Sequence, residues 1–369
     1  MKVKKRSLSA FLWGIFYLAM IDLAVNLIFP YPKDPRDIAP STIQQYFEFG
    51  RSVEGKYARM TRKTNDESAP IVSSGWLENQ EDHFLAKDRN YSDKPIVTVY
   101  GMSHAFYLAD DMAKIDNTLT IRAFCAPAAV PSWSFTAYSI DKERQHSNVV
   151  ILAVLTSGVP LISTTSGGTA FFDSSSPYTY PRYFLSNGIL KHISPPFISV
   201  DGYREYFFDS EKWKEYLNWM KENDKYFNDL LFRKTILDNS SVFRVLRRAY
   251  ASAAKRKKVS AVYDDAKGFN DNSDEVKILK AIVIEFAKNA RRDKSLPIIY
   301  IANNINTSDH LFRLLESTLK TYEIPFLSSH IICPPNDPRN FLPDHHFIPS
   351  LNIKIAKAMT KIVHDNLNK

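Results

Sequence analysis

The chain has 369 residues, of which 44% are hydrophobic and 13% aromatic, and its formal net charge is +8. This length gives room for one large domain or two modest ones with a sizeable core. The moderately basic balance suits anionic partners but identifies none of them. The sequence shows no zinc-finger spacing, no P-loop and no internal repeat, which argues against the metal, nucleotide and solenoid classes that these patterns mark.

The N-terminus reads as a membrane anchor. Residues 1–6 form a basic tail, and residues 7–30 form an apolar run long enough to span a bilayer. No A-x-A-like cleavage site follows the run, so an uncleaved signal anchor is favoured over a cleaved signal peptide. The basic tail then stays in the cytoplasm, and everything after Pro30 is periplasmic or extracellular. Asp22 is costly in lipid, so it lies near an interface, binds a partner helix or is simply tolerated near the outer end of the span.

Residues 31–94 are expected to form a stalk and a packing segment rather than a domain of their own. The segment starts with a Pro-containing stretch, and a short helix is expected from Ser41 to about Ser52. An oxidising compartment would permit a disulfide between the two cysteines, Cys125 and Cys333. Sequence alone does not give their separation, and two free thiols are favoured.

From residue 95 the pattern changes to alternating strands and helices. The apolar runs predict strands at 96–100, 119–124, 149–155, 297–302 and 325–332. Helical spacing predicts helices near 104–115, 132–142, 273–290 and 308–321, with a closing helix at the C-terminus. This alternation predicts an α/β domain over 95–369, a three-layer α/β/α sandwich with a five-stranded parallel sheet. Residues 158–270 interrupt the pattern as a helical insert, which is either a lid at the substrate site or packing.

Several polar side chains follow these strands directly. Because the carboxyl ends of parallel strands meet at one edge of a sheet, a site is expected there. The residues predicted at this edge are Ser103, Thr156, Ser157, Asn303, Asn304, Asp344 and His346.

Three of these side chains suit nucleophilic catalysis. A serine hydroxyl needs a base to take its proton, and the base needs an orienting acid. We therefore predict Ser103 as nucleophile, His346 as base and Asp344 as orienting acid, with the backbone N–H of Ser103 stabilising an oxyanion. The alternatives are that Ser103 and Asp344 cap helices, that His346 is structural, or that His345 is the base.

Two blocks carry a family resemblance. The block from Val99 to His104 (Val-Tyr-Gly-Met-Ser-His) resembles the nucleophile block of the SGNH/GDSL hydrolase superfamily, which reads Gly-Asp-Ser in most members. The block from Asp344 to Asn352 resembles its last block, of the form Asp-x-His. The aspartate and the histidine of this block, Asp344 and His346, are two positions apart rather than three. This spacing and the N-terminal anchor resemble the membrane-anchored branch that includes alginate O-acetyltransferases. The resemblance covers about 95–369 and also implies an SGNH or flavodoxin-like sheet.

The resemblance implies a serine esterase or O-acyltransferase acting on acyl groups, O-acetyl groups in particular, of a cell-surface or exported polysaccharide. An acylated glycan is then the partner, and an acyl-donor membrane protein is a further one. No cofactor is expected. The chain departs from the family at Met102, which replaces an aspartate, and at Ala128, where the region 125–129 lacks the oxyanion glycine. Ser157 stands in the region where the family has an asparagine.

These departures leave Ser157, Ala128, Asn303 and Asn304 as weaker oxyanion or substrate candidates. They also favour an alternative function, a catalytically inactive SGNH-like protein that binds glycan or acts as a scaffold in the cell envelope. A lipid esterase at the membrane surface is a third hypothesis. Sequence does not separate transfer from hydrolysis, because the two differ only in whether sugar or water reaches the acyl-enzyme.

Three further features have competing interpretations. A basic stretch meets either anionic lipid and acidic polysaccharide or only solvent. The aromatic segment 178–184 either packs in the core or stacks on sugar rings. Metal binding at residues 344–346 is disfavoured, because no second cluster has ligand spacing, and nucleic acid is not an expected partner. The basic stretch consists of Arg244, Arg247, Arg248, Lys255, Arg256, Lys257 and Lys258.

Overall fold

The computed structural model describes residues 2–35, 37–61, 75–78 and 94–367. The chain divides into two compact units, and each is described by itself. Unit 1 consists of Met1–Ser73, Gly168–Pro177 and Tyr226–Arg256. Unit 2 consists of Ser74–Gly167, Tyr178–Lys225 and Lys257–Lys369. The segment expected as one insert, residues 158–270, therefore contributes to both units.

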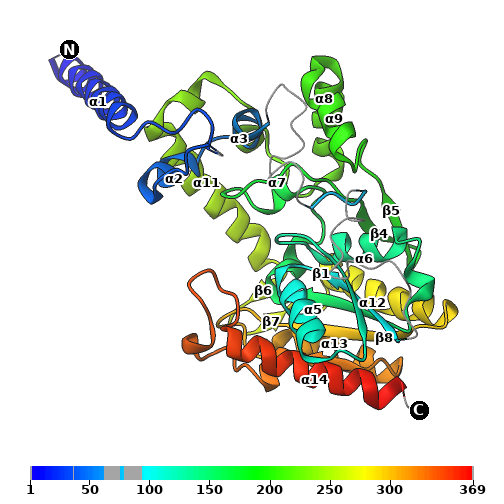
Figure 1. Ribbon diagram of the computed structural model, residues 1–369. Helices are drawn as coiled ribbons and strands as arrows, with labels where there is room; N and C mark the ends of the chain where they lie inside the picture. The colour runs from blue at the N-terminus through cyan, green and yellow to red at the C-terminus, as the bar shows by residue number, and fades with distance from the viewer. Residues whose placement is uncertain (1, 36, 62–74, 79–93, 368–369) are drawn as a thin grey trace. The chain divides into compact units, whose positions relative to one another are not determined.

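Unit 2 is an α/β fold built on a five-stranded, all-parallel sheet (Figure 1). The strand order is β2-β1-β3-β8-β9, the order of flavodoxin-type doubly wound sheets. Such sheets bind ligands where the strand order reverses, which here is at the carboxyl end of β1. The strands are β1 (Ile96–Gly101), β2 (Thr120–Cys125), β3 (Val149–Leu155), β8 (Leu296–Ala302) and β9 (Phe326–Ser328).

The sheet strands are short apolar runs because helices cover them. Every residue of β1 is buried, and so is every residue of β3 except its last. Helix α5 packs against α14 and strands β1 and β2, whereas α6 packs against β1, β3 and α12. The helices following these strands are α5 (Ser103–Ile115), α6 (Pro131–Ile140), α12 (Asp274–Arg292), α13 (His310–Thr321) and α14 (Pro349–Leu367).

The expected strands and helices of this domain are confirmed, with two shifts. The last strand is shorter than expected, because β9 ends at Ser328 and the chain turns into a 3-10 helix, η5 (Ser329–Ile331). Helix α6 begins at Pro131, where the missing N–H costs no hydrogen bond. The remaining elements of unit 2 are η2 (Arg144–His146), η3 (Thr156–Leu161), β4 (Arg182–Ser186), β5 (Ile189–Ile193), α8 (Val200–Phe208), α9 (Ser210–Asn223), β6 (Tyr263–Asp264), β7 (Gly268–Phe269) and η6 (Pro338–Asn340).

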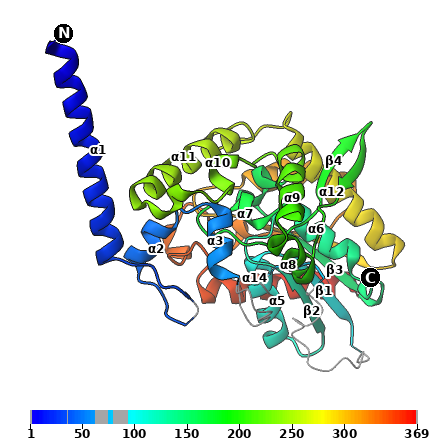
Figure 2. The same ribbon diagram turned by 90° about the horizontal axis from the view of Figure 1, so that it is seen from above.

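Unit 1 is helical and includes the apolar N-terminal helix. Within α1, the stretch Leu8–Ile28 is long and apolar enough to cross a membrane, and none of its most apolar window is buried in the protein. Figure 2 shows α1 as one long helix with α2 near its C-terminal end. The elements are α1 (Lys2–Ile28), α2 (Thr42–Glu48), α3 (Val53–Met60), α7 (Gly167–Ala170), α10 (Asp229–Phe232), η4 (Ile236–Asn239) and α11 (Ser241–Ser260), the ends of α7 and α11 lying in unit 2.

The helix expected from Ser41 to about Ser52 is shorter, because α2 ends at Glu48 and a separate helix, α3, begins after Ser52. Ser41 and Gln44 form a capping box at the start of α2. Ser52 then caps α3, accepting a hydrogen bond from the backbone N–H of Gly55 at 3.0 Å. A capping serine at each helix start explains both boundaries.

Two arginines of the basic stretch on α11 face neither lipid nor solvent. Arg244 and Arg247 are buried, and they form ion pairs with Glu48 and Asp238 respectively. Both interpretations of these two arginines were therefore wrong. Glu48, 196 residues away in the chain, and Asp238, nine residues away, pair with these buried guanidinium groups, as buried charges require.

Both cysteines are free thiols, as favoured from the sequence. Cys333 is fully buried. Burial raises the pKa of its thiol to about 12, the nearby Asp337 adding to the shift, so this thiol is not ionised at neutral pH.

Candidate active site

Ser103 is the first residue of α5 and stands two residues beyond β1. The turn before it is tight: a Cβ on Gly101 would lie 2.6 Å from the Ala105 Cβ and 2.7 Å from the Ala153 Cβ. Met102 is the extended N-cap residue and makes no side-chain hydrogen bond to the helix. The glycine therefore lets the strand turn directly into the helix, which places Ser103 at the carboxyl edge of the sheet.

Asp344 and His346 lie on a short hairpin between η6 and α14. The N–H of Leu342 donates to the carbonyl of His346 at 2.7 Å, and the N–H of His345 donates to the carbonyl of Leu342 at 2.9 Å. His345 has a φ of 69°, the left-handed value that closes a three-residue hairpin loop. Pro343 stands at the loop position that favours its fixed φ. The turn chemistry thus fixes the direction of the following histidine.

The serine and the histidine meet although they are 243 residues apart in the chain. The Ser103 Oγ lies 2.7 Å from the His346 Nε2. The His346 Nδ1 lies 3.0 Å from the Asp344 Oδ2, an ion-pair distance reached at an angle outside hydrogen-bond geometry. The Asp344 Oδ1 also accepts the backbone N–H of His346 at 3.2 Å. The expected order of groups, hydroxyl to imidazole to carboxylate, is present.

Asp344 is exposed, with 64% of its side chain accessible. The side chain of His346 lowers the pKa of this carboxyl below its usual value, and the backbone N–H of His346 lowers it further. Asp344 is therefore ionised at neutral pH and available to orient the imidazole. The exposure means that water competes with His346 for the carboxylate.

His104 is a buried neighbour of the pair rather than a surface residue. Its ring centroid lies 4.9 Å from that of His346 and 4.9 Å from that of Phe347. Neither ring nitrogen has a hydrogen-bond partner among the residues that the structure describes. Burial lowers the pKa of His104 to about 3, and the nearby His346 adds to the shift while the backbone of His345 opposes it. His104 is thus a neutral ring beside the proposed base.

This burial predicts a pH dependence of stability. The unfolded chain binds a proton at His104 below pH about 6.5 and the folded protein does not, so stability falls as pH drops from about 6.5 to about 3. We expect His104→Phe to remove a loss on the order of 1.4 kcal/mol per pH unit. Urea unfolding between pH 4 and pH 8 measures this, with His192→Phe, at an exposed histidine, as control. An unchanged slope in His104→Phe contradicts the assignment.

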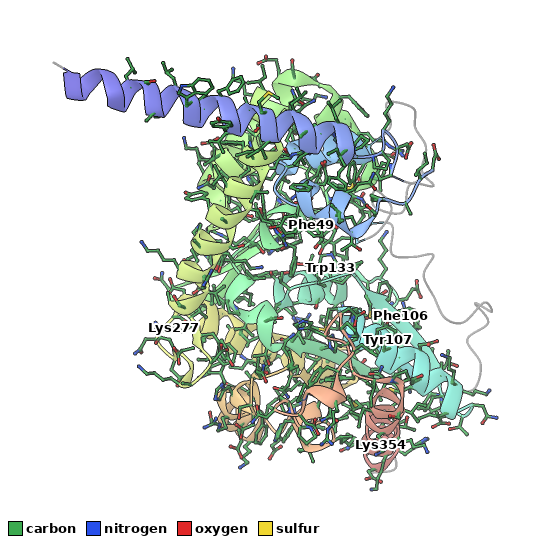
Figure 3. The ribbon with its side chains drawn as sticks, turned by 90° about the vertical axis from the view of Figure 1, so that its left-hand side faces the viewer. Phe49, Phe106, Tyr107, Trp133, Lys277 and Lys354 are labelled. Carbon is green, nitrogen blue, oxygen red and sulfur yellow. The ribbon has the colours of Figure 1, made fainter. Side chains whose placement is uncertain are left out.

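Two aromatic residues on α5 flank the site, and sequence analysis did not single them out. Figure 3 shows Phe106 and Tyr107 on this helix, and both are exposed. The Tyr107 ring meets the His346 ring edge to face, with centroids 5.2 Å apart. Phe106 and Tyr107 follow Ser103 by three and four positions, and residues at this spacing share a helix face. This spacing could have predicted from the sequence that they lie near the site.

Ala128 lies in a turn next to the carboxyl end of β1. The Ala126 N–H donates to the carbonyl of Gly101 at 3.1 Å, and the Ala129 N–H donates to the carbonyl of Ala126 at 3.3 Å. With Pro127 second and Ala128 third, at a φ of 54°, this is a type II-like turn whose third position favours glycine. An alanine therefore stands at a turn position whose backbone conformation favours glycine.

The other weak candidates are engaged in internal bonds. The backbone N–H of Ser157 donates to the Asn304 Oδ1 at 2.8 Å, so this N–H is not directed at Ser103. Asn303 is fully buried, with its side chain donating to the Ser329 Oγ at 3.2 Å and accepting from the Thr156 hydroxyl at 3.3 Å. These bonds give Asn303 and Asn304 structural roles at the strand end. Ser157 is exposed, and its hydroxyl remains a candidate donor.

The aromatic segment 178–184 packs inside unit 2. Tyr178, Tyr180 and Tyr183 are all buried, which favours the packing interpretation over sugar stacking. The Tyr178 hydroxyl donates to the carbonyl of Pro127 at 2.8 Å, so the segment supports the turn that contains Ala128. No group of three or more His, Cys, Asp or Glu side chains within the described ranges is placed to hold a metal ion.

The comparisons with known proteins add no relative. No protein-family model, no curated protein and no solved structure matches this chain. The geometry of Ser103, His346 and Asp344 is therefore the main indication of function.

Proposed function

We propose that the protein is a membrane-anchored, extracytoplasmic serine esterase or O-acyltransferase of the SGNH type. The single observation that carries this proposal is the 2.7 Å contact between the Ser103 Oγ and the His346 Nε2, with Asp344 behind the imidazole. The contact joins the start of α5 to the hairpin before α14, 243 residues later in the chain. A helix-capping serine would instead direct its hydroxyl to the backbone, and α5 has Met102 as its N-cap.

The chemistry is acyl transfer through a serine ester. The Ser103 oxygen attacks the ester carbonyl of the substrate while the His346 Nε2 takes the hydroxyl proton. The tetrahedral intermediate collapses, the alcohol leaves with that proton, and Ser103 carries the acyl group. Water or a sugar hydroxyl, deprotonated by His346, then attacks the acyl-enzyme and regenerates the serine. Asp344 stabilises the imidazolium in both halves of the reaction.

The start of α5 supplies the oxyanion donors. The first N–H groups of a helix have no intrahelical partner, and they carry the positive end of its dipole. An aspartate at position 102 would cap these groups, whereas Met102 leaves them for a negatively charged oxygen. The backbone N–H of Ala128 is proposed as a second donor. The hydrogen bond from the Ala126 N–H to the Gly101 carbonyl holds its turn at the same edge of the sheet.

Helix packing supports the proposed three-layer arrangement. Helices α5 and α14 pack together, as do α6 and α12, and each pair packs against strands of the same sheet. Two helix layers on opposite faces of the sheet account for strands buried on both sides. The parallel order β2-β1-β3-β8-β9 is compatible with an SGNH fold.

The proposed location is a single membrane pass with a cytoplasmic N-terminus and a periplasmic or extracellular site. Its support is the apolar stretch Leu8–Ile28 and the basic residues before it. The C-terminal part of α1 is also hydrogen-bonded to folded parts of unit 1, which favours an anchor over a cleaved signal. The proposed substrate is an O-acetylated cell-surface or exported polysaccharide, and the acyl donor is a membrane protein or a soluble ester.

A fluorophosphonate probe tests the nucleophile directly. An activated serine displaces fluoride and becomes covalently labelled. We expect stoichiometric labelling of the full-length protein and none of Ser103→Ala. Ser210→Ala is the control, because Ser210 is an exposed serine at the start of α9, outside the proposed site, and labelling of this variant should be unchanged. Labelling that persists in Ser103→Ala would overturn the assignment.

A second candidate is an inactive SGNH-like glycan-binding or scaffold protein. The exposed Asp344 carboxylate and the engaged Ser157 N–H favour it. This function predicts a folded protein that no fluorophosphonate labels but that binds an O-acetylated polysaccharide. The same labelling experiment therefore separates the two candidates.

A further inference from the structure

Helix α1 carries two polar side chains near its C-terminal end. Asp22 and Asn26 are one turn apart and therefore share a face of the helix. Asn26 donates to the backbone carbonyl of Asp22 at 2.9 Å, which holds the pair together. An apolar helix meant only to cross lipid has no use for two such residues on one face.

Both side chains bind the start of α11. The Asp22 Oδ1 accepts the Ser241 hydroxyl at 2.6 Å and the backbone N–H of Val242 at 3.1 Å, so an aspartate from α1 caps a helix more than two hundred residues away in the chain. Asn26 accepts from the Arg244 Nη2 at 3.0 Å and donates to the carbonyl of Asn239 at 3.3 Å. These hydrogen bonds fix η4 and the start of α11 against α1.

The position of these bonds along α1 sets their depth. The apolar stretch Leu8–Ile28 has 21 residues and spans about 31 Å, close to the hydrocarbon thickness of a bilayer of about 30 Å. Asp22 stands six residues before Ile28, which is about 9 Å along the helix. If the stretch crosses the bilayer, the residues bonded to Asp22 and Asn26 lie in the outer part of the span, within about 9 Å of its outer end.

The segment held at that depth exposes apolar side chains. Ile236 is 84% exposed and Leu237 is 44% exposed, and both belong to η4, the element that ends at Asn239. Leu246 on α11 is also exposed. Isoleucine and leucine in this position are unfavourable in water and favourable at the edge of the hydrocarbon. The bonds to α1 make the bilayer the occupant, because they keep these side chains beside the span.

We propose that Ile236 and Leu237 insert into the outer interface of the membrane that α1 spans. The inference rests on the proposed membrane anchor and goes beyond it, since it makes η4 a second membrane contact of unit 1. Asp22 then has a defined role: it satisfies the start of α11 at a depth where water no longer does. The chemical class of the ligand is the acyl chain and glycerol region of a phospholipid.

Depth-dependent quenching tests the proposal on the full-length protein in phosphatidylcholine vesicles. An environment-sensitive fluorophore is attached at Ile236→Cys and, as control, at Arg256→Cys, an exposed position on α11 in the same unit. Wild-type protein gives the background from the two native cysteines. We expect lipids with a nitroxide near the glycerol end of the chain to quench the label at 236 at least threefold more than the label at 256. A water-soluble quencher should show the reverse order.

Asp22→Leu tests the hydrogen bonds from Asp22 to the start of α11 separately from the membrane span. This variant keeps α1 apolar, so the protein should stay in the membrane after alkaline carbonate extraction, while the lipid quenching at 236 should fall towards that at 256. Equal quenching at 236 and 256 in a membrane-retained protein overturns the insertion. If Asp22→Leu leaves the lipid quenching at 236 unchanged, the role of the Asp22 hydrogen bonds is overturned. Release of the wild-type protein by carbonate overturns the anchor itself, and the inference with it.

Discussion

Replacing His346 by alanine is expected to lower kcat for an acetyl ester about 10³- to 10⁴-fold, because the Ser103 hydroxyl then has no base in reach. Hydrolysis of 4-nitrophenyl acetate by the full-length protein in detergent micelles measures the effect. KM should change little, since His346 acts on the proton rather than on the substrate. Circular dichroism should show an unchanged fold.

The double variant makes this prediction sharper. Residues of one catalytic unit are strongly non-additive, so Ser103→Ala/His346→Ala should be no slower than Ser103→Ala alone. His345→Gly is the matched control, because this neighbour is exposed and its φ of 69° suits glycine. We expect His345→Gly to keep activity within about threefold. Similar losses in both histidine variants would instead mean that the loop, and not the imidazole of His346, supports activity.

Much of unit 2 could be predicted from the sequence because its signals are local. A buried parallel strand such as β3 is a short apolar run, and the capping serine Ser273 marks the start of α12. The meeting of Ser103 with His346 followed from a topological rule rather than from local pattern, because parallel strands place their following loops at one edge. Neither the local signals nor the sheet-edge rule requires knowing which distant residues contact each other.

One missed element did have a local signal. The hairpin of β4 and β5 turns at Asn187 and Gly188, which both have positive φ values, the signature of a two-residue hairpin turn. The aromatic composition of the preceding segment drew attention to packing instead. Asn-Gly between two apolar runs was sufficient to predict the hairpin.

Other features had no local signal. The burial of Arg244 depends on Glu48, 196 residues away in the chain, and no spacing rule links the two. The left-handed φ of Ala128 was equally hidden, because alanine disfavours that conformation and only the surrounding turn imposes it. A partner helix was only one of three interpretations of Asp22 in the sequence, and its partner, the start of α11, came from the structure.

The buried pair of Arg247 and Asp238 gives the largest expected effect on stability. Asp238 also accepts the Ser52 hydroxyl at 2.6 Å and the Ser52 N–H at 3.1 Å, so the carboxylate joins three parts of unit 1. Removing one partner of a buried pair leaves an uncompensated charge, and Asp238→Ala is expected to cost about 3–5 kcal/mol. Thermal unfolding of the full-length protein in detergent micelles measures the loss.

Two comparisons and one pH series test the physical reason. Asp173→Ala removes the more exposed pair with Arg248 and should cost less than about 1 kcal/mol. The double variant Asp238→Leu/Arg247→Met should recover most of the loss, because no charge is left unpaired. Burial alone would raise the pKa of Asp238, but hydrogen bonds from Ser52 and Arg247 outweigh it and lower the pKa. The stabilisation is therefore complete above pH about 4 and is lost as the pH falls further, a slope that Asp238→Ala should lack. Equal losses in Asp238→Ala and Asp173→Ala would contradict the assignment of the buried pair.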